Sequence, residues 1–74
     1  MSQITELERF RAPLGGQEIE LQQISHVEGG MPLLRIRIRE GKRFTIIDID
    51  PLTAKNWSVA MLRWAGVQEM NERE

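Results

Sequence analysis

An alternating run near the middle of the chain restricts the fold more than any other feature of the sequence. Over residues 33–39, aliphatic side chains alternate with basic ones: Leu34, Ile36 and Ile38 with Arg35, Arg37 and Arg39. Successive side chains of a strand point to opposite faces, so this run predicts a strand with one apolar and one charged face. Such a strand needs pairing partners and a layer that covers its apolar face.

The segment upstream has a similar alternation, in which Ile19 and Leu21 follow Glu18 and Glu20. It predicts a strand over 18–27 that ends at the turn formed by Gly29 and Gly30. The alternation slips between Leu21 and Ile24. We therefore expect a β-bulge near Gln22 and Gln23 that turns both apolar groups toward the same core.

A third strand is predicted over 43–49, after a hairpin turn at Glu40 and Gly41. The simplest turn is a three-residue loop with Gly41 in the left-handed conformation. This loop would pair Ile36 near Phe44 and Leu34 near Ile46.

The strand 43–49 is apolar on both faces, because Ile47 and Ile49 point away from Phe44 and Ile46. A single helix covers only one face. The other face needs the N-terminal segment, a second subunit or the aliphatic stems of arginines. The candidate partner surface is Leu33, Ile47 and Ile49.

Asp50 followed by Pro51 predicts the start of a helix, because Asp caps free N–H groups and Pro suits the first helical position. The helix is expected over 51–66, with Gly66 as its C-terminal cap or with an extension to Met70. An apolar stripe along it comprises Ala54, Trp57, Met61, Trp64 and Ala65. We expect both tryptophans to be largely buried on Leu34, Ile36, Phe44 and Ile46, so that Trp64→Ala unfolds the domain. A groove along the stripe that holds a ligand or a partner helix is a less favoured interpretation.

Residues 2–11 fit either a short helix or a strand, and we choose a strand over 6–11. The prediction is therefore a single α+β domain spanning residues 1–74. It contains an antiparallel β-meander of three to four strands and one C-terminal amphipathic helix on one face of the sheet. The join from Phe44 to Pro51, with Trp57 and Trp64 after it, resembles the general pattern of small bacterial domains and implies no activity.

Seventy-four residues are near the lower size limit for a self-sufficient core, and small domains usually gain support from disulfides, metals or partners. The chain has no Cys and a single His, His26, so self-association is the expected support. No apolar run has the length of a signal peptide or of the roughly 18 residues in a membrane span. We therefore expect a cytoplasmic protein without membrane contacts.

The basic residues of the hairpin form a candidate surface for an anion or an acidic partner: Arg35, Arg37, Arg39, Lys42 and Arg43. Glu18 and Glu20 alternate in phase with these arginines, so cross-strand ion pairs are the favoured interpretation. A net charge of −1 disfavours general attraction to nucleic acid. A nucleic-acid-binding or regulatory module is kept as the alternative function.

Chemistry-bearing residues are sparse. Asp48 and Asp50, with His26 and Glu28 at the same sheet edge, could hold a cation, although Asp50 already serves as a helix cap. The serines and threonines lie in no nucleophile motif. We expect no enzymatic activity, no metal and no cofactor, and we predict a small protein-interaction domain that forms a homodimer.

Overall fold

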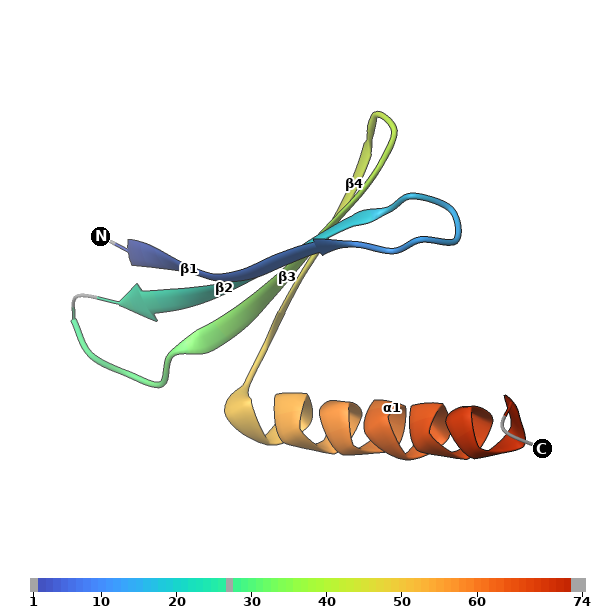
Figure 1. Ribbon diagram of the computed structural model, residues 1–74. Coiled ribbons are helices and arrows are strands. Elements are labelled where there is room, and N and C mark those ends of the chain that lie inside the picture. The colour runs from blue at the N-terminus through green and yellow to red at the C-terminus, as the bar shows by residue number, and fades with distance from the viewer. Residues whose placement is uncertain (1, 27, 73–74) are drawn as a thin grey trace.

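The computed structural model describes residues 2–26 and 28–72 (Figure 1). The elements, in chain order, are β1 (Ser2–Arg11), β2 (Glu18–His26), β3 (Leu33–Glu40), β4 (Arg43–Ile49) and α1 (Pro51–Glu72). Each strand pairs antiparallel with its sequence neighbour, in the sheet order β1-β2-β3-β4. This arrangement confirms the predicted α+β meander with a C-terminal helix. Val27, the last residue of the predicted strand 18–27, lies outside the described residues.

The N-terminal segment is an edge strand of the sheet. β1 pairs with β2 from Ser2 opposite His26 to Arg11 opposite Glu18. The segment therefore extends the sheet sideways, and it does not fold across either face as one of our expectations allowed.

The β3–β4 hairpin is tighter than predicted. Glu40 pairs with Arg43, so only Gly41 and Lys42 form the turn. Gly41 has a φ of 62°, while Lys42 has no positive φ, as in a type II′ turn with glycine first. The expected three-residue loop was wrong, and the register moves by three residues, because Ile36 lies opposite Ile47 and not near Phe44.

The corrected register exchanges the two faces of β4. Ile47 lies opposite Ile36 and Ile49 lies opposite Leu34. Phe44 and Ile46 instead lie opposite arginines on the other face. The side-chain period of a strand is two, so a slip by an odd number of residues turns every side chain to the other face.

The β-bulge is in β1 and not in β2. The register between β1 and β2 shifts between Glu6 and Glu8, whereas β2 pairs with β3 without interruption. The prediction near Gln22 and Gln23 assumed that Leu21 and Ile24 share a face. They do not, because Leu21 lies opposite Ile36 and Ile24 lies opposite Leu33.

Asp50 caps α1 as the sequence predicts. Its carboxylate accepts a hydrogen bond from the Thr53 backbone N–H at 3.2 Å, and the Thr53 hydroxyl donates to the same group. These bonds hold the pKa of Asp50 below its ordinary value. At the other end the helix continues through Gly66, which lacks a positive φ and is not a cap. The helix therefore extends six residues beyond the predicted range 51–66 and two beyond the alternative end at Met70.

The single chain contains almost no buried core. Ile24 is the one buried hydrophobic residue among those described, at 5% exposure, and lies between Ile4 and Leu33 on the adjacent strands. Trp57 is 43% exposed and Trp64 is 68% exposed, so the expectation that both are largely buried was wrong. The helix reaches the sheet mainly at β3, and Figure 1 shows its later turns running out beside the twisted sheet.

Among the described residues, no helix combines the length with the apolar composition that crossing a membrane requires.

Candidate functional site

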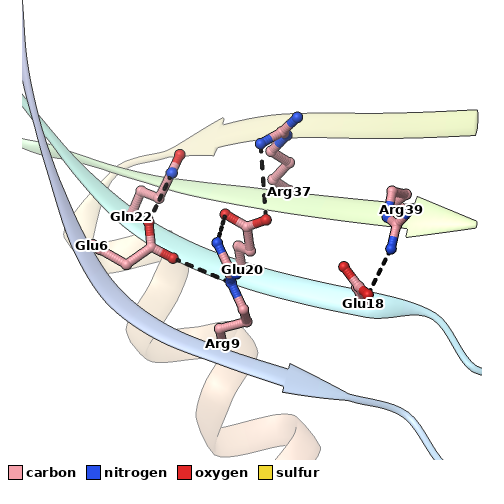
Figure 2. Close-up of polar contacts among 7 residues, drawn as sticks. All are labelled: Glu6, Arg9, Glu18, Glu20, Gln22, Arg37 and Arg39. Atoms are coloured by element: carbon pink, nitrogen blue, oxygen red, sulfur yellow. Dashed lines mark hydrogen bonds and ion pairs between the residues drawn. The ribbon is translucent and has the colours of Figure 1, made fainter.

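One face of the sheet, which we call the charged face, carries a network of ion pairs (Figure 2). Its arginines are Arg9, Arg11, Arg35, Arg37 and Arg39, and its carboxylates are Glu6, Glu18, Glu20 and Asp48. Oε1 of Glu18 lies 2.6 Å from Nη2 of Arg11 and 2.6 Å from Nη2 of Arg39. Oε2 of Glu20 lies 3.5 Å from Nη2 of Arg9, and its Oε1 lies 3.8 Å from Nη1 of Arg37.

Beside β4, Arg35 and Asp48 form a bidentate ion pair. Arg35 donates from Nε to one Asp48 oxygen at 2.8 Å and from Nη2 to the other at 3.0 Å. This hydrogen bonding lowers the pKa of Asp48 and raises the pKa of Arg35. Hydrogen bonding to Arg39 and then to Arg11 likewise lowers the pKa of Glu18. Each effect favours the charged form of the group.

Aromatic and apolar residues interrupt the charged face. The guanidinium carbon of Arg37 lies 4.7 Å from the ring centroid of Phe44, within cation–π range. Ile46 lies opposite Arg37, and Leu33 lies opposite Ile24. The register error in the predicted hairpin concealed the contact of Phe44 with Arg37.

The candidate anion surface is thus divided in two. Arg35, Arg37 and Arg39 are already neutralised by carboxylates of β2 and β4. Lys42 and Arg43, at the hairpin tip, have no ion pair with another described residue. Five arginines against four carboxylates leave little net charge, and an anion would have to compete with Glu18 and Glu20 for the arginines.

The candidate cation site at the opposite end of the sheet is not assembled. Asp48 is paired with Arg35, and Asp50 is engaged at the helix start. Within residues 2–26 and 28–72, no three or more His, Asp or Glu side chains cluster as metal ligands.

The other face of the sheet and the first half of α1 enclose an open apolar groove of about 260 Å³. We call it the helix–sheet groove. Its lining residues are Phe10, Ile19, Leu21, Leu34, Ile36, Ile38, Ile49, Ala54, Trp57, Ser58 and Met61. None of them carries a charge. Ser58 supplies the one hydroxyl, which donates to the Lys55 carbonyl at 2.9 Å.

The structure separates the three residues of the candidate partner surface. Ile49 lines the helix–sheet groove, and Ile47 belongs to the same face, since it lies opposite Ile36. Leu33 belongs to the charged face, but it also borders a second hollow at the start of α1 together with Leu7 and Pro51.

Sequence reasoning missed part of the groove. The sequence placed Phe10 in a strand but did not indicate to which face of the sheet its side chain belongs. It also did not single out Ile38 as a groove residue. Both have an apolar cross-strand neighbour in Ile19, which is a signal that correct strand pairing would have given.

No curated protein and no solved structure matches the chain. A family model described as "Family of unknown function (DUF6967)" matches residues 1–67. The chain therefore belongs to this family of unknown function, DUF6967.

Proposed function

We propose that this protein is a non-enzymatic interaction domain that works as a homodimer. The observation that carries the proposal is its accessible surface of 6338 Å². A compact monomer of 8.6 kDa exposes about 4,700 Å², so the single chain has an excess of about 1,600 Å².

The shape of the chain supports the same proposal. Its radius of gyration is 15.0 Å, against about 11 Å for a compact domain of 74 residues. Counted from two chains, the excess surface comes to about 3,200 Å², which falls in the range of obligate homodimer interfaces. The excess surface is thus large enough for a permanent dimer.

Exposed apolar side chains surround the helix–sheet groove. On the apolar face of the sheet and along the tryptophan stripe of α1, the large hydrophobic side chains that stay open are Phe10, Ile47, Trp57, Met61 and Trp64. Exposed apolar patches often mark protein–protein interaction sites. The absence of charged groups from the helix–sheet groove also gives general acid–base chemistry no residue to use there, which favours binding over catalysis.

Sedimentation equilibrium tests the proposal directly. At chain concentrations of about 1–100 μM we expect twice the chain mass of 8.6 kDa. Adding about 0.5 M salt should leave the mass unchanged, because the surface to be buried is apolar and salt screens only charges. A folded species with the mass of one chain at about 100 μM would contradict the homodimer.

A further inference from the structure

We propose that the helix–sheet groove of each chain is filled by the second half of α1 from a second copy, so that two chains exchange their helix ends reciprocally. The proposal rests on the homodimer proposed above and specifies its interface. The occupant is residues 62–72 of the partner, with Trp64 as the inserted side chain.

Only the first half of α1 contributes to the helix–sheet groove. All helix residues that line it lie between Ala54 and Met61. The remaining turns, residues 62–72, are about 16 Å long and line neither hollow of the structure. Beyond Met61, the chain's own helix therefore supplies no lining residue to the groove.

The free half of α1 has the surface that this groove requires. Trp64 lies seven residues after Trp57, so the two side chains share one helical stripe within about 20°. Ala65 and Gln68 continue the stripe, which thus has no charge beyond Met61 until the last turn. Arg63 and Glu69 lie on other sides of the helix. The stripe that enters the groove in one half is exposed in the other half, where Trp64 is 68% open.

Two-fold symmetry lets the groove of each chain bind the helix end of the other chain. In a two-fold dimer, a contact from the helix end of one chain to the groove of its partner occurs twice. Each chain then buries both its open groove and its exposed helix end. The alternative surface, the charged face, already satisfies its own polar groups through ion pairs and gains less from burial.

A matched pair of charge substitutions on α1 tests the interface. Trp64→Glu places a carboxylate on the stripe that enters the groove, so we expect the dimer dissociation constant to rise by at least about 30-fold. Val59→Glu adds the same charge on the side of α1 opposite the groove-lining residues and outside residues 62–72, and we expect a change of less than about 3-fold. If Val59→Glu dissociates the dimer and Trp64→Glu does not, the interface lies on the outer side of the helix and the exchange is wrong.

Tryptophan fluorescence separates failure of this inference from failure of the homodimer. The chain has two tryptophans, so Trp57→Phe leaves Trp64 as the one emitter. We expect Trp64 in the dimer to emit at short wavelength and to resist iodide quenching, and to lose both properties on dilution in step with the mass from sedimentation. A dimeric mass with fully quenchable Trp64 overturns the helix exchange and leaves the homodimer standing. A monomeric mass for the unsubstituted chain at about 100 μM overturns both.

Discussion

The carboxylates of β2 each hold two arginines that come from different strands. Glu18 bridges Arg11 of β1 and Arg39 of β3, and Glu20 does the same for Arg9 and Arg37. Loss of Glu18 would leave Arg11 and Arg39 without a carboxylate partner among the described residues, whereas Arg9 would keep Glu6 after loss of Glu20. Single residues in the central strand therefore have more influence than an isolated surface ion pair usually has.

The lowered pKa of Glu18 predicts a loss of stability in acid. A carboxylate whose folded pKa lies below its ordinary value of 4.5 stabilises the fold above that pH, and this contribution is lost as the pH falls through the folded pKa. The thermal midpoint, measured by circular dichroism at fixed chain concentration, should therefore fall between about pH 5 and pH 3. Asp48 and Asp50, with ordinary values of 3.8, add to the same decline.

Two variants identify the source of this acid sensitivity. Glu18→Gln should have a lower midpoint than the parent at neutral pH and a smaller drop on acidification. Glu40→Gln, which removes a carboxylate without an ion pair to another described residue, should follow the parent curve. Equal slopes for Glu18→Gln and the parent would show that Glu18 does not contribute.

At the scale of elements, the sequence predicted strand and helix positions well because local patterns determine them. The alternation over 33–39 and the Asp50–Pro51 cap need no knowledge of the rest of the chain. The facing of β4 was predicted wrongly, because Phe44, Ile46, Ile47 and Ile49 are apolar on both sides and pattern alone cannot choose between them. The length of the turn decides the choice, and a glycine with positive φ suits both two-residue and three-residue turns.

Paired substitutions in β4 test the observed register. Ile47→Glu puts a charge on the apolar face opposite Ile36, and we expect a loss of more than about 2 kcal/mol in unfolding free energy. Ile46→Glu places the same charge opposite Arg37, and a change within about 0.5 kcal/mol is expected. Urea melts at one fixed concentration give both values. A larger loss of unfolding free energy for Ile46→Glu than for Ile47→Glu would contradict the observed register and support the three-residue loop.

Two glycine substitutions test the turn of the β3–β4 hairpin and the continuity of α1. Gly66→Ala should raise stability by about 0.5–1 kcal/mol, since Gly66 lies within the helix and an added Cβ meets no atom within 4 Å. Gly41→Ala also has open space around it, but at a φ of +62° it should lose about 1–2 kcal/mol. Chemical denaturation gives the two signs. A destabilised Gly66→Ala would instead support a helix end at Gly66.

At the scale of the whole molecule, the direction of the tryptophan stripe could be predicted, but its burial could not. Helical periodicity places Trp57 and Trp64 on one side, and the structure indeed puts Trp57 in the helix–sheet groove. Periodicity gives no information on how closely α1 approaches a twisted sheet. Trp64 lies beyond the residues that line the groove, which only the three-dimensional path of the chain reveals.

The stability of a dimer depends on its concentration, and the proposed assembly should show this dependence. Raising the chain concentration from about 1 to 100 μM should raise the thermal midpoint by about 5–10 °C, because folding is linked to association. Differential scanning fluorimetry or calorimetry measures the shift. A midpoint that stays constant over this range means that unfolding does not involve dissociation.

The order β1-β2-β3-β4 sets the sequence of events during synthesis. Each strand needs only the strand made just before it, so the sheet can form while α1 is still inside the ribosome. At about 5–20 residues per second, synthesis of the 22 residues of α1 takes roughly 1–5 s after the last strand is made. Until α1 is in place, the nascent chain exposes the aliphatic face of its sheet, and exposed apolar surface of this kind makes partly folded chains prone to aggregation.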